Sequence, residues 1–300
     1  MLKKTSNIKR KFIIGSEWLS YKIYMGTQTT DTFVKTQLPG ILANLEKREC
    51  INDWFFIRYA DPDLHLRLRF RLKDPHKISD ITSALYQVLE PLLEDRLIHK
   101  VQIDTYSREL ERYGYHTIEE SEELFGINSN MIISLLNAIN DDENKRWLWG
   151  MKAIDVLLNE FDYNLQEKRD LLLELKTDFG NEFRVNKAIR KQLSMKFRKY
   201  RKHIVELLHQ ESQNEVDIQL KGYSKAYNQI AKKIALKTGP GNFKKHSDYL
   251  MYSYLHMHCN RLFPSKQRMN EWVLYDLLYQ HYYSEYARKK KQNEVMRVAV

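Results

Sequence analysis

The most regular pattern of hydrophobic and polar positions in this chain runs over residues 61–72. Leucine and phenylalanine take one parity, and the other parity holds His65, Arg67, Arg69 and Arg71. Since successive side chains of a β-strand point to opposite faces, this pattern predicts a strand with one apolar and one basic face. A basic face is typical of a strand that faces water, and also of one that binds anions through its guanidinium groups. The strand alone does not decide between the two.

The segments around this strand predict three more strands and two helices. Alternating, aromatic-rich segments indicate strands, and apolar positions spaced 3.6 residues apart indicate helices. In chain order we expect a strand over 17–25, a helix capped by Asp31 and ending near Arg48, strands over 53–59 and 61–72, a helix over 76–95 and a strand over 99–107. This order is that of the split βαβ, ferredoxin-like arrangement, in which the third strand is central.

From about residue 117 the strand signals end and helical periodicity takes over. The expected helices cover 117–125, 129–139, 142–162, 165–178, 183–210, 212–236, 246–262 and 265–297, with breakers that include Gly126 and Gly180. We therefore predict an α+β fold with a ferredoxin-like βαββαβ antiparallel sheet in residues 1–116. An all-helical region, residues 117–300, is expected to pack on this sheet as part of one compact unit.

Composition and charge narrow the class of protein. The chain is 43% hydrophobic and carries 49 Lys and Arg against 39 Asp and Glu, so its net charge of +10 favours acidic partners. Cys50 and Cys259 are isolated, which predicts neither a disulfide framework nor a Cys/His metal site. No signal peptide or apolar run of membrane-spanning length is visible. We expect a cytoplasmic protein with no cofactor and no metal.

Several large enzyme classes have no support in the sequence. The chain contains no G-x-x-x-x-G-K-[ST], G-x-G-x-x-G, G-x-S-x-G or H-E-x-x-H motif. Nucleotide hydrolysis, dinucleotide redox chemistry, α/β-hydrolase chemistry and zinc peptidase chemistry therefore lack their usual signatures.

Two segments outside the basic strand carry side chains suited to acid–base or anion chemistry. Glu109 and Arg112 are neighbours in a helical turn, either as an ordinary exposed ion pair or as part of a site beside the basic strand. In the expected helix 246–262, His258 aligns with apolar residues and is assigned a structural role. His256 lies on a more polar face, where it is either structural or a general acid or base.

Four motifs in this order resemble the C-terminal domain of class I lantibiotic dehydratases. The same domain occurs alone as the thiopeptide-type bacteriocin biosynthesis protein. The motifs are GSEWL at 15–19, WFFIRY at 54–59 followed by DP and HLRLRF at 65–70, YSRELERYG at 106–114, and HM with NRL within 256–262. The resemblance runs from about residue 15 to beyond residue 280, nearly the whole chain.

The resemblance implies a glutamate elimination reaction. In that family a partner domain attaches glutamate from glutamyl-tRNA to Ser or Thr of a precursor peptide, and this domain expels the glutamate to leave dehydroalanine or dehydrobutyrine. Carried over position by position, the catalytic residues are Arg67, Arg69, Glu109, Arg112 and His256. The substrate-binding residues are Arg67, Arg69, Arg112, Tyr106 and Asn260. Fixed guanidiniums suit developing negative charge and carboxylates, and an imidazole suits proton transfer.

The resemblance also implies partners. They are a precursor peptide with its leader, a tRNA-dependent glutamylating dehydratase and a cyclase. Because the motifs begin at residue 15, the glutamylating dehydratase is expected on a separate chain. The aromatic content is compatible with a homodimer or with a complex with that chain. No direct contact with nucleic acid is expected.

Three other readings stay open. A pyridine-forming cycloaddition enzyme of thiopeptide type shares the resemblance, but it has no glutamate to expel. A non-catalytic subunit that binds and presents the precursor peptide would not need acid–base residues. RNA binding would use the basic strand or residues 187–202, which hold eight Lys and Arg and no acid. RNA-binding sheets of this topology offer aromatic side chains where this strand offers arginine, which disfavours the last reading.

Overall fold

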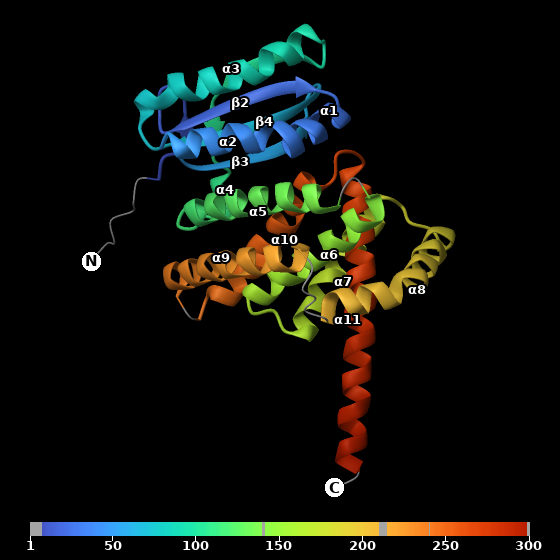
Figure 1. The fold of residues 1–300 in the computed structure, drawn as a ribbon. Helices are drawn as coiled ribbons and strands as arrows, with labels where there is room; N and C mark the ends of the chain where they lie inside the picture. The colour runs from blue at the N-terminus through green and yellow to red at the C-terminus, as the bar shows by residue number, and fades with distance from the viewer. Residues whose placement is uncertain (1–7, 140–141, 210–214, 240, 299–300) are drawn as a thin grey trace, which may run out of the picture. The chain divides into compact units, whose positions relative to one another are not determined.

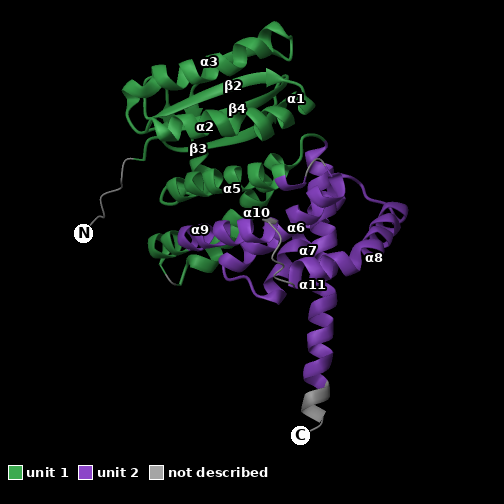
Figure 2. Ribbon diagram, viewed as in Figure 1, with its two compact units in different colours: residues 1–137, 232–265 green, residues 138–231, 266–300 purple. Residues whose placement is uncertain are grey.

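The computed structural model describes residues 8–139, 142–209, 215–239 and 241–298 (Figure 1). The chain divides into two compact units (Figure 2). Unit 1 comprises Met1–Asn137 and Lys232–Ser265, and unit 2 comprises Ala138–Ala231 and Lys266–Val300. This division differs from the predicted boundary at residue 116 and from the predicted single compact unit. Helices from beyond that boundary belong with the sheet, because they contact its edge strand.

Unit 1 is built around a four-stranded antiparallel sheet in the described part of the chain. The strands lie in the order β3-β4-β2-β5, so β4, which carries the basic row, is central. Helices connect β2 to β3 and β4 to β5. The α+β class is thereby confirmed, with strands β2 (Trp18–Met25), β3 (Ile51–Ala60), β4 (Leu64–Leu72) and β5 (Ile98–Asp104).

The apolar face of the sheet packs on the connecting helices. Leu66, Leu68 and Phe70 of β4 are fully buried. On the same face, the hydroxyl of Tyr21 on β2 lies 3.1 Å from the hydroxyl of Thr82 on α3. The first connection holds α1 (Thr27–Thr32), a π-helical turn η1 (Phe33–Gln37) and α2 (Leu38–Lys47). The second holds a short 3-10 helix η2 (Pro75–Lys77) and α3 (Ile78–Glu94).

Asp31 does not cap a helix, in contrast to the prediction. The first helix begins earlier, at Thr27, and Asp31 is buried within it. Its carboxylate accepts a hydrogen bond of 2.6 Å from the Nη2 of Arg58 on β3. A short acidic residue near a helix start has the signature of a cap, and only the tertiary structure shows that it serves a buried ion pair.

The helix α5 (Ile118–Ile139) is continuous, whereas the sequence predicted two helices separated by Gly126. A Cβ atom at Gly126 would lie 2.2 Å from Oδ1 of Asp53 and 3.1 Å from the carbonyl oxygen of Trp54. The glycine therefore serves as the point where α5 comes closest to β3 and is not a helix breaker.

The remaining elements of unit 1 complete the edge and end of the sheet. A two-stranded antiparallel pair joins the N-terminal segment to the residues after β5. The short helix α4 (Leu110–Tyr113) follows, and α10 (Phe243–Leu262) contributes from late in the sequence. The strand pair consists of β1 (Lys11–Phe12) and β6 (Tyr106–Ser107).

Unit 2 is helical in its described residues. A buried network at its centre has Asp155 on α6 accepting hydrogen bonds from Lys168 on α7, at 2.6 Å, and from the hydroxyl of Tyr282 on α11, at 2.7 Å. No helix in the described ranges combines the length and apolar character needed to cross a membrane. The helices are α6 (Glu143–Glu160), α7 (Leu165–Glu182), α8 (Lys187–His209), most of α9 (Glu215–Thr238) and α11 (Gln267–Val298).

Replacing Gly126 with alanine should lower the free energy of unfolding by about 1–3 kcal/mol, because the new methyl group meets Asp53 and the backbone of Trp54. Urea unfolding followed by circular dichroism measures the change. Gly40→Ala in α2 is the matched control, since the space beside Gly40 is open and alanine favours a helix. An equal stability of Gly126→Ala and the parent would contradict the close packing of α5 on β3.

The stability of the protein should depend on pH through Asp53. Burial raises the pKa of this carboxyl group from 3.8 to about 7. Between these values the folded chain holds a proton that the unfolded chain has lost. The free energy of unfolding should therefore fall as pH rises through this range, by at most about 1.4 kcal/mol per pH unit. Urea unfolding across the range should show a shallower slope for Asp53→Asn, and identical slopes would contradict the assignment.

Candidate functional site: the basic face of the sheet

The face of the sheet opposite the apolar one is lined by the charged side chains of β4 and its neighbours. In the antiparallel register, Arg67 of β4 lies opposite Lys22 of β2 on one side and Ile57 of β3 on the other. His65 lies between two aromatic partners in the same way, Tyr24 and Tyr59. Cations and aromatic rings thus gather at one end of this face.

Arg67 is held by a neutral histidine and an aromatic ring. Its Nε donates a hydrogen bond of 3.1 Å to Nε2 of His65. The Nδ1 of His65 lies 2.8 Å from the carbonyl oxygen of Asp63 and must donate to it, because a carbonyl only accepts. Burial lowers the pKa of His65, which keeps this tautomer neutral. The guanidinium of Arg67 lies 3.6 Å from the ring centre of Tyr59.

Arg69, two residues along the same face, is held by aromatic rings. Its guanidinium carbon lies 4.3 Å from the ring centre of Tyr106 and 5.3 Å from that of Phe55. The Nε of Arg69 is buried with no hydrogen-bond partner among the described residues. Burial lowers the pKa of Arg69, which means that the charged form is poorly solvated there.

Arg67 and Arg69 form no ion pair with an acidic side chain of the described residues, and Glu109 and Glu122 act on Arg69 only at longer range. Within the described chain neither guanidinium has a carboxylate within ion-pair distance, whereas Lys22 beside them pairs with Asp104 at 2.6 Å. A half-buried cation without a counter-ion is costly, and an anion brought to it recovers part of that cost. This face is therefore suited to bind a carboxylate or a developing oxyanion.

Glu109 and Arg112 form an exposed ion pair at the start of α4. Their side chains are about half exposed, and Nε of Arg112 lies 3.1 Å from Oε2 of Glu109. The helix ends at Gly114, whose φ of +76° is readily adopted by glycine. A Cβ there would also lie 2.8 Å from the hydroxyl of Thr117. The predicted neighbour relation is present, and both side chains are exposed to solvent.

One face of α10 connects this pair to the sheet. Tyr249, His256 and Asn260 follow at seven- and four-residue spacing, which places them along one helix face. At one end, the hydroxyl of Tyr249 donates a 2.8 Å hydrogen bond to the carbonyl oxygen of Glu111 on α4. At the other end, the amide of Asn260 contacts Arg58 on β3. His256 lies between these two residues along the helix and is half-buried.

Two residues expected to bind substrate are engaged within the protein. The side chain of Asn260 accepts from the backbone N–H of Arg58 at 3.0 Å and donates to its carbonyl oxygen at 2.8 Å. The hydroxyl of Tyr106 donates a 2.6 Å bond to buried Glu122, and its ring covers Arg69. Their atoms hold the framework of the site, and direct contact with a substrate stays a prediction for both.

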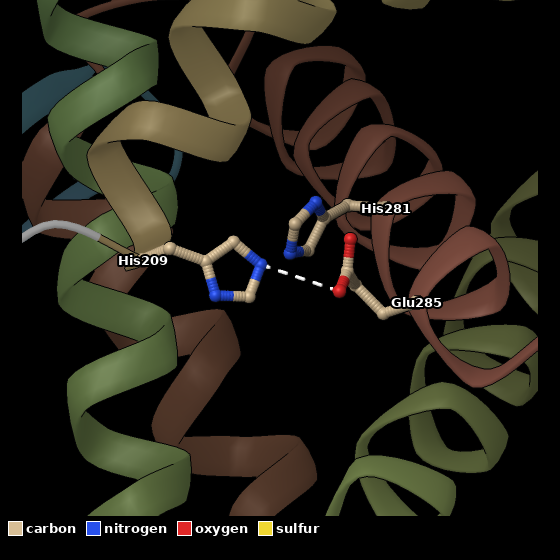
Figure 3. Close-up of side chains that lie close together, drawn as sticks. All are labelled: His209, His281 and Glu285. Carbon is tan, nitrogen blue, oxygen red and sulfur yellow. Dashed lines mark ion pairs between the residues drawn. The ribbon is translucent and has the colours of Figure 1, made fainter. Parts of the chain in front are cut away.

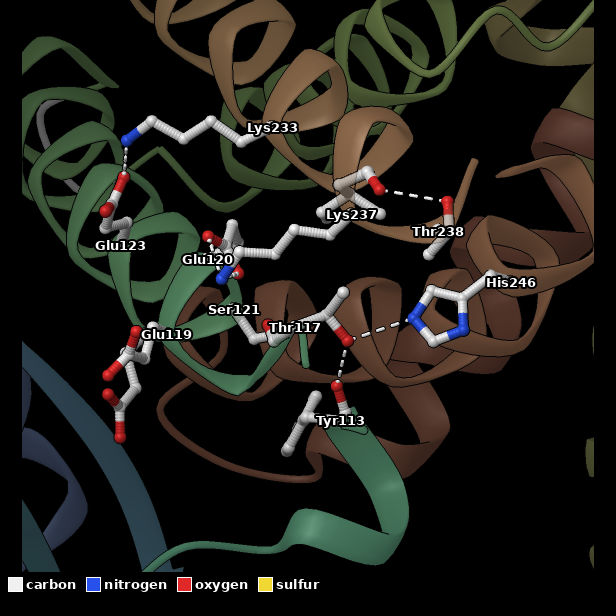
Figure 4. A network of polar contacts seen from close by, with 12 residues as sticks. Tyr113, Thr117, Glu119, Glu120, Ser121, Glu123, Lys233, Lys237, Thr238 and His246 are labelled. Atoms are coloured by element: carbon white, nitrogen blue, oxygen red, sulfur yellow. Dashed lines mark hydrogen bonds and ion pairs between the residues drawn. The ribbon is translucent and has the colours of Figure 1, made fainter. Parts of the chain in front are cut away.

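A polar network holds the connection from α4 to α5 against the end of α9 and the start of α10 (Figure 4). The hydroxyl of Thr117 donates to the carbonyl oxygen of Tyr113 at 2.6 Å and lies 2.9 Å from Nε2 of His246. Lys237, at the end of α9, donates to Glu120 on α5 at 2.8 Å. The network anchors the turn that carries Glu109 and Arg112 without using either of them.

The sequence placed His65 on the basic face but did not predict its hydrogen bond to Arg67, and it missed Lys22 and Tyr59 as side chains of this face. Lys22 and Tyr59 are on strands whose register with β4 the sequence does not state. In the described residues this face brings together no cluster of His, Cys, Asp and Glu of the kind that holds a metal ion.

Comparison with known proteins agrees with the motifs. A family model described as the C-terminal part of lantibiotic biosynthesis dehydratases matches residues 18–283. Nisin biosynthesis protein NisB of Lactococcus lactis subsp. lactis is 28% identical over 288 residues, which cover 92% of this chain and 26% of NisB. The chain spans about a quarter of the length of the curated relatives that it matches.

Two solved structures share the fold. The tRNA dependent lantibiotic dehydratase MibB from Microbispora sp. 107891 has a TM-score of 0.69 at 19% identity, covering 90% of this chain and 28% of MibB. TbtD, a pyridine synthase from thiomuracin biosynthesis, has a TM-score of 0.57 at 10% identity, covering 88% of this chain and 97% of TbtD. The resemblance seen in the motifs is confirmed by the family model, which covers most of the chain. The chain therefore belongs to the lantibiotic biosynthesis dehydratase C-terminal family.

Proposed function

We propose that this chain is a lyase, a split dehydratase subunit that eliminates glutamate from glutamylated Ser or Thr of a ribosomally made precursor peptide. The product is dehydroalanine or dehydrobutyrine, in lantibiotic- or thiopeptide-type biosynthesis. The observation that carries the proposal is the pair of arginines on β4, Arg67 and Arg69, which face the same way without acidic partners in the described chain. A glutamyl ester offers the carboxylates that such a pair binds.

The reaction needs one base and a place for negative charge. A base removes the Cα proton of the modified residue, the Cα–Cβ double bond forms, and the electron pair of the Cβ–O bond leaves with the glutamate carboxylate. His256 is assigned the proton transfer. Arg67 and Arg69 stabilise the charge that develops on the adjacent carbonyl and on the leaving carboxylate. Arg112 binds the glutamyl group, and Glu109 orients Arg112 through their ion pair.

Preorganisation supports these assignments. Arg67 uses its Nε on His65, so its two terminal nitrogens stay available for a bidentate contact with a carboxylate. The ring of Tyr59 fixes the plane of the guanidinium. A group held in place before the substrate arrives costs little reorganisation in the transition state.

The proposal extends to the arrangement of the sheet and to the partners of the reaction. The observed strand order and the two helical connections support a ferredoxin-like arrangement for the sheet of unit 1. The reaction also needs a partner that makes the glutamyl ester, for which we propose the separate tRNA-dependent dehydratase chain. A precursor peptide with its leader is the proposed substrate, and a cyclase and a second copy of this chain are further proposed partners.

A pyridine-forming cycloaddition is the alternative. It is favoured by the shared fold with a pyridine synthase of nearly the same length. That reaction joins two dehydroalanines and has no glutamate to expel, so an arginine pair suited to a carboxylate would serve it less directly. A peptide that already contains two dehydroalanines separates the two reactions.

Incubation of a chemically glutamylated Ser/Thr peptide with this chain should yield a dehydro residue through loss of the glutamate unit together with the Ser or Thr oxygen. Mass spectrometry detects this loss directly. His256→Phe should slow the reaction by about 100-fold or more, because the proton transfer is lost. His76→Phe, at an exposed position in η2, is the control. Elimination by His256→Phe at the parent rate would remove His256 from the mechanism, and an unchanged peptide with the parent protein would remove the proposed function.

Arg67→Lys should lower kcat/KM for the glutamylated peptide by about tenfold or more, since lysine keeps the charge but loses the planar bidentate contact. Arg71→Lys is the matched control, because Arg71 lies on the same face of β4, four residues beyond Arg67 and opposite Trp18 and Asp53. Steady-state elimination kinetics measure both variants. An equal loss in Arg71→Lys would indicate a general effect of basic charge on this face.

A further inference from the structure

Three side chains with metal-binding atoms converge within unit 2 (Figure 3). His281 and Glu285 stand one turn apart on α11, so both point from the same helix face. His209, the last residue of α8, comes from a different part of the sequence. One ligand atom from each of the three lies within 4.8 Å of the other two.

The ion pair between His209 and Glu285 does not involve His281, although His281 lies beside both. His281 is 3% exposed, and within the described chain its ring nitrogens have no hydrogen-bond partner. These nitrogens are not among the fully enclosed unpartnered atoms of the described chain, so an ion or a water molecule can reach them. Figure 3 shows the ring of His281 beside the carboxylate of Glu285 and the ring of His209. The rings of the two histidines lie 5.4 Å apart between their centres.

One of the three distances between ligand atoms already matches a tetrahedral metal ion, and the other two lie within 4.8 Å. Nε2 of His209 lies 3.4 Å from Oε2 of Glu285. Two ligands of a tetrahedral Zn²⁺ ion, each about 2.0–2.1 Å from the metal, are separated by about 3.3–3.4 Å. Two imidazoles and one carboxylate are a known zinc donor set, in which water fills the fourth position.

The surroundings allow an ion to enter. Glu285 also pairs with Arg288, whose side chain is half exposed. His209 is half exposed and lines a cavity of about 310 Å³, so an ion can reach its imidazole from solvent.

We propose that His209, His281 and Glu285 bind a divalent transition metal ion, with zinc as the best fit. Imidazole and carboxylate ligands suit zinc better than calcium or magnesium, which prefer oxygen ligands alone. The ion would join the end of α8 to α11 and would satisfy the buried imidazole of His281. This site is independent of the proposed elimination reaction, because none of its residues lies on the basic face of the sheet.

Isothermal titration of the chelator-treated full chain with Zn²⁺ tests the proposal. We expect one ion per chain and at least tenfold weaker binding in His281→Ala and in Glu285→Gln. His209→Ala is the second variant. Because His209 is half exposed, its replacement should not disturb the fold, so a loss of binding would reflect the lost ligand. His203→Ala, at an exposed position on the same helix α8, is the matched control and should bind as the parent does.

Two further readouts separate a built site from loose binding. Co²⁺ in place of Zn²⁺ should give the visible absorption bands of a tetrahedral complex in the parent and in His203→Ala, but not in His281→Ala. Zn²⁺ should raise the melting temperature of the parent and leave that of His281→Ala unchanged. The proposal is overturned if the parent binds no stoichiometric ion, or if the ligand variants bind as well as His203→Ala.

Discussion

The arrangement of the candidate site depends on how the open edge of the sheet is covered. β3 is an edge strand, and its backbone groups need partners on the side away from β4. Asn260 supplies both a donor and an acceptor to Arg58, and Nε of Arg261 donates to the carbonyl oxygen of Phe56 at 2.9 Å. These contacts fix α10 along β3. They also fix the position of His256, one turn before Asn260.

Close packing of α5 completes the same edge. Gly126 lets this helix approach β3, and the hydroxyl of Ser129 accepts a hydrogen bond from the backbone of Phe56 at 3.3 Å. The aromatic layer that results, in which Phe125 of α5 packs edge-on against Phe55 at 5.4 Å, covers one end of the basic face. Arg67 lies outside this layer and is held by Tyr59 and His65 instead.

The arginines of this region differ in whether a carboxylate neutralises their charge. Arg108 is buried but fully compensated, because Glu122 accepts from its Nε at 2.8 Å and from its Nη2 at 2.6 Å. Arg67 and Arg69 have rings and a neutral imidazole around them instead of carboxylates. Ring faces hold a guanidinium in place without neutralising it. Arg108 thus differs from Arg67 and Arg69 in having a carboxylate partner at ion-pair distance.

The sequence by itself determined the strands, the central position of the basic row, and the motifs that resemble the lantibiotic dehydratase family. These follow from local periodicity and from motifs, which are written in consecutive residues. It did not determine that Asp31 is an ion-pair partner, that Gly126 is a contact point, or that Asn260 binds a strand backbone. Nor did it bring His209 to His281. Each of these depends on which segments meet after folding, and that is decided by long-range packing, which no local pattern records.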